Sequence, residues 1–502
     1  MKRFLVSFVL LLGLSFAYSQ TYEIDFYAKV LKGYEKLKKG DEIHVIGMTH
    51  KLSFDNSNPV HSYVVLTDKG QVRVKEKLER VLDVDYKNAQ NYWDAQIIFN
   101  VLEYLSDNGT QEQRRAEMEN YTLDYIKWAK EKGLTFNDPY LESYIYSIIA
   151  KLSPTVLIDG RPGIVNLLIL SDPIANASMY PNGTLVITTG LLSLLHSEDE
   201  LAAVLAHEIA HFVLDHSIQN YTKDENTRKR AEFWAEVAAG VAAVADGYLA
   251  AKNPYYRPGA VTTATVLAAS QIATSVCKQL GMKYSRMQES EADVKAKELM
   301  DVLKYDSNAL ATALTRIEES LKQERSIEMY FASDHPALID RIKAAGIPQN
   351  SVDPNFEKKI SFAVSDAAFW KMQNRRYRQA LPLYSQNINN NVAIADDYIQ
   401  KANCLLSMRS DEESYKEINS LINEAKKIEP NNINIIKTEI VSSLRQDKYR
   451  EAKNLLNNYK DKLISILNNK EKPEDEWQRA YSYAAEEITW VNQMLLKLRS
   501  FN

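Results

Sequence analysis

The sequence predicts a mostly helical α+β protein that ends in a series of helical repeats. Residues 164–170 and 183–188 are apolar segments of strand length, and a long apolar helix follows them, an order that is typical of an α+β core. From Phe356 onward the chain contains no glycine and shows helical patterns joined by polar segments. At roughly 100–200 residues per domain, 502 residues indicate about three domains.

The composition excludes several classes of protein. With 45% hydrophobic and 25% charged residues, the chain resembles neither a disordered protein nor a polytopic membrane protein. The net charge of −5 offers no basic field for a phosphate backbone, so we expect no nucleic-acid partner. Cys277 and Cys404, whose pairing stays open, are too few for a disulfide framework, so any metal must be held by histidine and carboxylate.

Residues 1–19 are expected to be a cleaved signal peptide. Two basic residues precede an apolar run over residues 4–16, and Ala17-Tyr18-Ser19 has the small-x-small pattern that favours cleavage after Ser19. The run is shorter than the roughly 20 residues that span a bilayer. We therefore expect a secreted protein, periplasmic if the source is a Gram-negative bacterium, and an uncleaved N-terminal anchor is the alternative.

Residues 20–135 are predicted to form a small β module followed by helices. Segments 42–48 and 62–74 are rich in β-branched and aromatic residues, and Asp68-Lys69-Gly70 within the second segment favours a hairpin turn. Residues 88–132 show helical spacing. No motif in this region indicates a chemical function.

Residues 136–350 are predicted to form the domain that carries the chemistry. Asp138-Pro139 is a favourable helix start, because a capping side chain precedes proline at the first helical position, and the amphipathic pattern continues to Leu152. Alanine-rich stretches over 235–251 and 259–276 are expected to be packed helices of a soluble domain, since charged and small residues make poor membrane spans. Contact with a membrane is expected to be peripheral at most.

Residues 355–502 are predicted to form helical repeats. Tyr377, Tyr415 and Tyr449 recur at intervals of 38 and 34 residues, and each is followed three residues later by alanine or isoleucine. This period resembles that of tetratricopeptide repeats, although plain helical hairpins remain an alternative. Either arrangement would present a surface that binds another polypeptide.

The most specific motif is His207-Glu208-x-x-His211, which lies in the apolar segment 197–216. Ser197 and Glu200 are spaced as a capping box at the start of this helix. Histidines four residues apart share one face of a helix, so both imidazoles can reach one zinc ion. Glu208 lies beside that face and can take a proton from water at the metal.

A third ligand is needed, because catalytic zinc sites have three protein ligands and one open position. The extended metzincin motif is excluded, since Leu214 and Ser217 stand where it needs glycine and histidine. His216 is therefore expected to be a solvated residue at the end of the helix. A carboxylate from a later helix is the alternative ligand.

The segment Glu289-Ser290-Glu291-Ala292-Asp293, which begins 78 residues after His211, gives the chain a resemblance to a known family. Together with the His207 motif it resembles the gluzincin zinc metallopeptidases that include the CAAX prenyl protease, HtpX and the periplasmic BepA. The resemblance implies that Glu289 is the third zinc ligand, in a site with one Zn²⁺ per chain. It also implies that Asp293 orients a ligand histidine, while Glu291 is expected to be a surface or salt-bridge residue.

Two further segments resemble the same family. Residues 176–191 are similar to the strand and turn before the active-site helix, where an exposed strand edge can pair with an extended substrate. Ser333-Asp334-His335-Pro336, with Arg341 after it, is similar to the closing segment of the periplasmic members. That similarity implies that His335 caps the zinc or assists the reaction. The helical repeats also match the plan of BepA-like members.

The predicted function is a zinc-dependent endopeptidase of the periplasm or the extracellular space, with polypeptide substrates. The family resemblance implies misfolded or misassembled proteins as substrates, a role in protein quality control, and an envelope protein-assembly partner that binds the repeats. The alternative is a repeat-based chaperone or scaffold whose zinc site is structural or dormant. A membrane-embedded prenyl-type protease is a third candidate.

Overall fold

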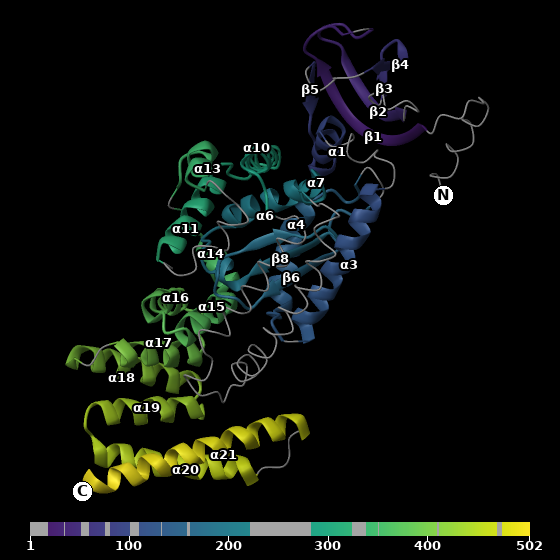
Figure 1. Ribbon diagram of the computed structural model, residues 1–502. Helices are drawn as coiled ribbons and strands as arrows, with labels where there is room; N and C mark the ends of the chain where they lie inside the picture. Colours follow the sequence, from purple (N-terminus) through teal and green to yellow (C-terminus); the bar gives the residue numbers. More distant parts are fainter. Residues whose placement is uncertain are drawn as a thin grey trace.

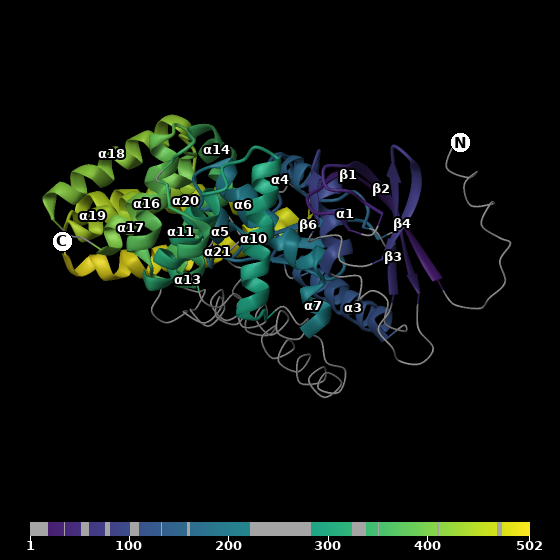
Figure 2. The same cartoon turned by 90° about the horizontal axis from the view of Figure 1, so that it is seen from above.

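The computed structural model shows an elongated molecule whose parts follow one another in sequence order (Figure 1). The N-terminal strands lie at one end and the C-terminal helices at the other, and the view from above in Figure 2 shows the same separation. The structure describes residues 19–34, 36–51, 60–75, 81–100, 110–131, 133–157, 161–220, 283–323, 338–349, 351–408, 411–468 and 474–501.

The N-terminal part is a five-stranded antiparallel sheet. Its strands are β1 (Ser19–Val30), β2 (Glu42–Lys51), β3 (Val60–Thr67), β4 (Gly70–Lys75) and β5 (Leu82–Asp85). They lie in the order β4-β3-β2-β1-β5. The predicted strands over 42–48 and 62–74 are confirmed, and Gly70 ends the predicted hairpin turn in a left-handed conformation, with φ +108°.

Strand β1 is absent from the sequence-based prediction, although its pattern is clear in the structure. From Glu23 to Val30 its side chains alternate between exposed and buried, with Ile24 and Phe26 in the core of the sheet. Most of the outward positions are charged, with Tyr27 as the exception, which is why hydrophobicity alone does not reveal the strand. A period of two residues is the signal that would have identified it.

The predicted helical region over 88–132 consists of two helices, α1 (Ala89–Asn100) and α3 (Thr110–Glu131). Helix α1 packs on strand β1 and also contacts the central domain. There the indole N–H of its buried Trp93 donates to the carbonyl oxygen of Leu152 at 2.7 Å. A buried indole N–H needs such an acceptor, so this contact fixes how α1 lies on the domain.

The central domain contains a three-stranded sheet. Its strands are β6 (Asn166–Leu170), β7 (Ala177–Met179) and β8 (Thr184–Thr188). Strand β8 lies in the middle, parallel to β6 and antiparallel to β7. The two predicted strands are confirmed, and the turn before β8 places Gly183 at φ +79°. Among the described residues β7 pairs with β8 alone, so it is an edge strand of this sheet.

Helices pack around this sheet. They are α4 (Pro139–Leu152), α5 (Thr189–Leu192), α6 (Glu198–Val213), α7 (His216–Asn220), α10 (Arg286–Val302), α11 (Ala309–Gln323) and α13 (Leu338–Ala345). The side chain of Asp138 accepts from the first backbone N–H groups of α4, which confirms the predicted cap. Helix α6 is buried on every face from residue 200 to 213, between β7 and helices α4, α10 and α11.

The C-terminal third is entirely helical in the part that the structure describes. Its helices are α14 (Pro354–Lys359), α15 (Ser361–Gln373), α16 (Tyr377–Asn389), α17 (Ala395–Met408), α18 (Glu412–Ile428), α19 (Ile433–Arg445), α20 (Tyr449–Asn468) and α21 (Glu474–Lys497), with a final 3₁₀ turn (Leu498–Phe501). From α15 to α21 each helix packs against the next.

The spacing that suggested helical repeats corresponds to a repeated position in this array. Ala380, Ile418 and Ala452 lie in α16, α18 and α20, and all three are completely buried where these helices pack on their neighbours. The prediction of a mostly helical α+β protein is thus confirmed, while the tetratricopeptide character of the helices stays a prediction.

Several predicted features lie outside the described residues. These are most of the signal peptide, the two alanine-rich stretches, Cys277 and His335. Within the described ranges no helix combines the length and the apolar character that crossing a bilayer requires. Cys404 is a buried free thiol, and burial raises its pKa to about 12.

Gly190, in α5, is a position where the fold requires glycine. A Cβ atom there would lie 2.4 Å from the carbonyl carbon of Pro173, which is too close for any real contact. We expect Gly190→Ala to lower the free energy of unfolding by about 1–3 kcal/mol, because backbone must move to admit the methyl group. Gly33→Ala is the matched control, since its nearest neighbour would lie at 3.5 Å. Calorimetric unfolding temperatures that fall equally in both variants would contradict this account.

Candidate metal centre

The start of helix α6 is held by a polar cluster. The Ser197 side chain accepts from the backbone N–H of Glu200 at 3.2 Å, as predicted. The predicted capping box is only half formed, because the Glu200 carboxylate accepts from the backbone N–H of His196 at 3.0 Å and pairs with Arg316 of α11 at 3.0 Å. Burial raises the pKa of Glu200 despite these partners. The ion pair with α11 thus replaces the local cap that the sequence suggested.

The two motif histidines converge on one point with a carboxylate from α10. His207 Nε2 lies 3.1 Å from His211 Nε2, and oxygens of Glu289 lie 3.6 Å and 3.4 Å from these two atoms respectively. These residues are buried, and together they form a group that could hold a metal ion. Donor atoms at the corners of a zinc tetrahedron are separated by about 3.3–3.4 Å, given bond lengths of about 2.0–2.1 Å. The donor set therefore fits zinc closely.

Glu289 is held in place by the start of α10. Ser285 and Gln288 form a complete capping box, in which each side chain accepts from the backbone N–H of the other residue. The Gln288 amide also donates to the side chains of Gln219 and Asn220 in α7. The first turn of α10, which carries Glu289, is thereby joined to the segment that follows α6.

Glu208 lies at the boundary between α6 and the edge strand. Its side chain is buried, and one carboxylate oxygen accepts from the backbone N–H of Met179 in β7 at 3.2 Å. That N–H points away from β8, since the neighbouring Tyr180 N–H is the one that bonds across to Thr184. The carboxylate thus lies between the metal-binding histidines and the outer edge of β7.

Asp293 contacts the first histidine from the side opposite the metal-binding atom. Its carboxylate lies 2.9 Å from His207 Nδ1, as the family resemblance implied. Arg341 of α13 makes two hydrogen bonds to the same carboxylate, at 2.7 Å and 2.8 Å. Burial alone would raise the pKa of Asp293, but hydrogen bonds from Arg341 and His207 hold it at about 2. Asp293 can therefore keep the ring of His207 oriented with Nε2 toward the metal position.

Arg341 is a site residue to which the sequence assigned no role. Its guanidinium is buried and contacts Glu289 as well as Asp293. Burial lowers the pKa of Arg341, but the charges of Asp293, Glu289 and Glu208, in decreasing order of effect, raise it above its ordinary value. Three carboxylates thus surround one guanidinium, and a divalent cation would bring this group to neutrality. Its position six residues after His335 was the one available signal.

His216 corrects a prediction. It was expected to be solvated, but its side chain is buried and its Nδ1 lies 2.8 Å from Nδ1 of His211. The chain turns at Asp215, which has φ +56° and accepts two hydrogen bonds from Arg115, so α7 folds back beneath α6. Glu291 is a partly exposed salt-bridge residue, as expected, and its partner is His216 at 3.5 Å.

The environment of His211 favours its neutral form. Burial lowers the pKa of His211 well below its ordinary value. The ring of Tyr284 stacks on it, with centroids 3.6 Å apart and planes inclined by 14°. Only a neutral imidazole can donate its lone pair to a metal, so this environment suits a ligand.

Removal of the Arg341 side chain should lower the stability of the protein, and bound zinc should offset part of this loss. We expect Arg341→Met to lower the free energy of unfolding by about 3–5 kcal/mol without metal, because Glu289 and Asp293 remain buried without their cation. Zinc should raise the unfolding temperature of this variant by more than that of the wild type. Arg316→Met is the control, since it deprives the buried Glu200 of its partner far from the metal position. An equal response to zinc in all three proteins would contradict the charge-balance argument.

Comparison with known proteins agrees with this geometry. The family model for peptidase family M48 matches residues 139–347. Mitochondrial metalloendopeptidase OMA1 of Arabidopsis thaliana is 31% identical over 119 residues, covering 24% of either chain. The Schizosaccharomyces pombe protein of that name is 29% identical over 240 residues, covering 46% of this chain and 62% of the relative. A Vibrio cholerae protein named "Putative beta-barrel assembly-enhancing protease" is 27% identical over 218 residues, covering 43% and 41%.

The chain thus spans between about a quarter and three fifths of the length of these relatives. The matched segment contains the motif helix, Glu289, Asp293 and Arg341. Members of the matched family are zinc-dependent, and the cluster of His207, His211 and Glu289 supplies the ligands that such a metal needs. Residues 139–347 therefore form a domain of the peptidase M48 type, and its cluster of His207, His211 and Glu289 suits zinc.

Proposed function

We propose that this protein is a zinc-dependent endopeptidase that cleaves polypeptides. The observation that carries the proposal is the convergence of His207, His211 and Glu289 at separations of 3.1–3.6 Å, with the buried carboxylate of Glu208 beside them. A purely structural metal site would not need Glu208. The M48 domain and the metalloendopeptidase relatives support the same activity.

The residues around the metal position have different roles in peptide hydrolysis. A zinc ion held here supplies a Lewis acid that polarises the peptide carbonyl and makes an attacking water more acidic. Glu208 accepts the proton of that water and delivers it to the amine that leaves. Asp293 keeps His207 oriented, and Arg341 keeps Asp293 ionised.

An extended substrate is supported by the position of β7. The Met179 N–H faces Glu208 rather than β8, so the edge of β7 that lies away from β8 borders the proposed catalytic base. A peptide that pairs with this edge as an additional strand would bring its carbonyl groups toward the metal position. Such pairing depends on main-chain groups, which suits a protease that accepts many unfolded sequences.

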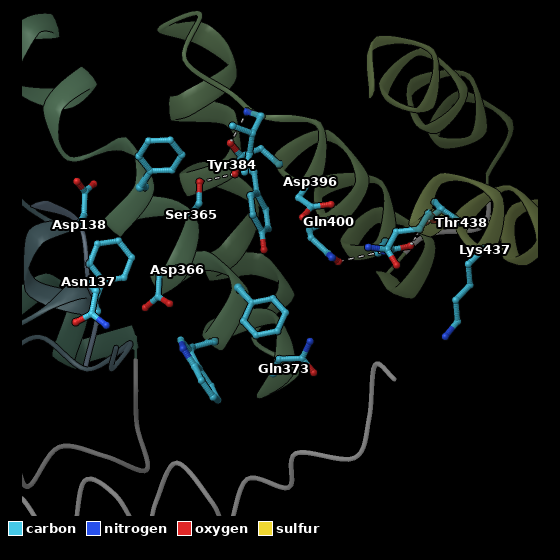
Figure 3. Close-up of a pocket in the computed structure, with 18 of the residues that line it drawn as sticks. Asn137, Asp138, Ser365, Asp366, Gln373, Tyr384, Asp396, Gln400, Lys437 and Thr438 are labelled. Carbon is cyan, nitrogen blue, oxygen red and sulfur yellow. Dashed lines mark hydrogen bonds between the residues drawn. The ribbon is translucent and has the colours of Figure 1, made fainter. Parts of the chain in front are cut away.

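The C-terminal helices are proposed to bind substrate or an assembly partner. A cavity of about 620 Å³ lies between the start of α4 and helices α15, α16, α17 and α19. Figure 3 shows the ring of Tyr384 pointing into it, between Asp366 and Gln400. Phe362, 53% exposed, forms part of the wall, and the Tyr384 hydroxyl is buried with no hydrogen-bond partner among the residues that the structure describes. Aromatic walls with a few polar groups suit apolar side chains of a polypeptide.

The proposed setting is the bacterial envelope, with protein quality control as the role. The leader pattern over residues 1–19 supports export to the periplasm or beyond. The printed name of the Vibrio cholerae relative refers to β-barrel assembly, which supports an envelope assembly partner for the C-terminal helices. Misfolded or misassembled polypeptides are the proposed substrates, and any contact with the membrane is peripheral.

Glu208→Gln is the decisive test of the activity. We expect this change to lower kcat/KM for unfolded casein by about 10²–10⁴-fold, because no carboxylate remains to move the proton. Zinc should stay at one ion per chain, whereas His207→Ala should lose it, as measured by metal analysis of the purified proteins. Glu412→Gln is the control, since that side chain is 90% exposed on α18.

Wild-type cleavage by Glu208→Gln would refute the proposed chemistry. Full function of cells that carry Glu208→Gln, together with loss of casein cleavage, would favour the alternative of a repeat-based chaperone or scaffold. A wild-type protein that binds no zinc would refute the metal site itself.

The docking role of the cavity can be measured separately from catalysis. In the Glu208→Gln background we expect Phe362→Ala to weaken binding of unfolded casein by about fivefold or more, in line with the loss of an aromatic anchor. Ile428→Ala, which removes a comparably exposed side chain (47%) outside the cavity, should bind as before. Fluorescence anisotropy with labelled casein provides the dissociation constants. Equal binding by both variants would argue against docking at this cavity.

A further inference from the structure

The ring of His211 has two nitrogen atoms that face different partners. Its Nε2 faces the metal position, 3.1 Å from Nε2 of His207 and 3.4 Å from Glu289. Its Nδ1 faces the opposite way and lies 2.8 Å from Nδ1 of His216. Beyond this second ring, Nε2 of His216 lies 3.5 Å from a carboxylate oxygen of Glu291. Three side chains therefore form a line that leads from the metal position to the surface.

The requirement for metal binding determines where the protons lie along this line. A metal needs the lone pair of His211 Nε2, so the single proton of the neutral ring must be on Nδ1. Nδ1 then donates to Nδ1 of His216, which must be an acceptor. The proton of His216 is consequently on Nε2, the atom that faces the carboxylate of Glu291. Glu291 thus determines the tautomer of His216, and His216 determines the tautomer of His211.

We propose that His216 is the positioning residue for zinc ligand His211, and that Glu291 holds His216 in the accepting tautomer. The inference rests on the proposed zinc-dependent function. It gives the two ligand histidines different partners: the carboxylate of Asp293 for His207 and the imidazole of His216 for His211. Partners of this kind orient the ligand ring and raise its basicity, and their loss weakens metal binding.

The surroundings of His216 hold it in this position. Asp215, in the left-handed conformation, accepts from both terminal nitrogens of Arg115 at 2.9 Å and 2.8 Å, which fixes the turn from α6 into α7. His216 is 1% exposed. On the other side of His211 the Tyr284 ring stacks at 3.6 Å, and its hydroxyl lies 3.1 Å from the Ser217 hydroxyl. The plane and the rotation of the His211 ring are therefore both restrained.

A pair of buried histidines could instead serve packing alone, and two substitutions separate these roles. His216→Leu fills the space but has no acceptor. His216→Asn places a carbonyl oxygen close to the position of Nδ1, so it keeps an acceptor for His211 while losing ring volume. A positioning role predicts that asparagine preserves zinc binding better than leucine, whereas a packing role predicts the reverse order.

The experiment measures zinc affinity and the metal's surroundings in the purified full-length protein. We expect His216→Leu to raise the Kd for zinc by about 10–100-fold, determined by competition with a chelator. The visible absorption spectrum of the Co²⁺-substituted protein should shift in the same variant, because the geometry of the His211 ligand changes. His216→Asn should retain a Kd close to that of the wild type. Glu412→Gln, on a side chain that is 90% exposed on α18, is the control and should leave both readouts unchanged.

Glu291→Gln provides a second route that does not disturb the core, because this side chain is 37% exposed. It should raise the Kd for zinc in the same direction as His216→Leu, by a smaller factor. A wild-type Kd and Co²⁺ spectrum in both His216→Leu and Glu291→Gln would overturn the inference, as would His216→Asn binding zinc more weakly than His216→Leu. A wild-type protein that binds no zinc would overturn the proposed function instead.

Discussion

The burial of charge around Glu289 is the constraint on which the rest of the structure depends. The carboxylates of Glu208, Glu289 and Asp293 lie in the interior near one guanidinium, that of Arg341, and the imidazoles of His207 and His211 complete the group. Burying an ion without compensation costs several kcal/mol, so a site of this kind persists only where its cations and hydrogen bonds are held in place. A divalent metal would complete that compensation. The charges that the reaction needs are therefore also charges whose burial costs free energy on folding.

The architecture meets this demand by fixing the ends of the helices that carry the site. Helix α6 begins at the ion pair of Glu200 with Arg316 and ends at the ion pair of Asp215 with Arg115. Helix α10 begins with the capping box at Ser285, which also joins it to α7. Because α6 is buried on every face, its neighbours leave it no freedom to rotate or slide. Contacts outside the metal-binding group therefore determine the positions of the ligand side chains.

Local sequence patterns predicted much of this correctly, and their failures have physical causes. The cap at Asp138, the strands before the motif helix and the spacing of His207 and His211 all depend on contacts within a few residues, which a sequence displays directly. The predicted capping box at Ser197 failed because a cation from a distant helix competes for the same carboxylate. The solvated position expected for His216 was wrong because the turn at Asp215 folds the following helix back onto the site. Strand β1 was missed because its outward face is mostly charged.

The sequence alone determined the chemistry of the site. Residues four apart on a helix share a face whatever surrounds them, and histidine and carboxylate ligands are the types that zinc prefers. Resemblance to a family then indicated which distant carboxylate completes the set. Only the tertiary structure decided that this carboxylate, the guanidinium of Arg341 and the imidazole of His216 meet at one place. The reason is that their proximity arises from packing of segments far apart in the chain, and such packing has no local signature in the order of the residues.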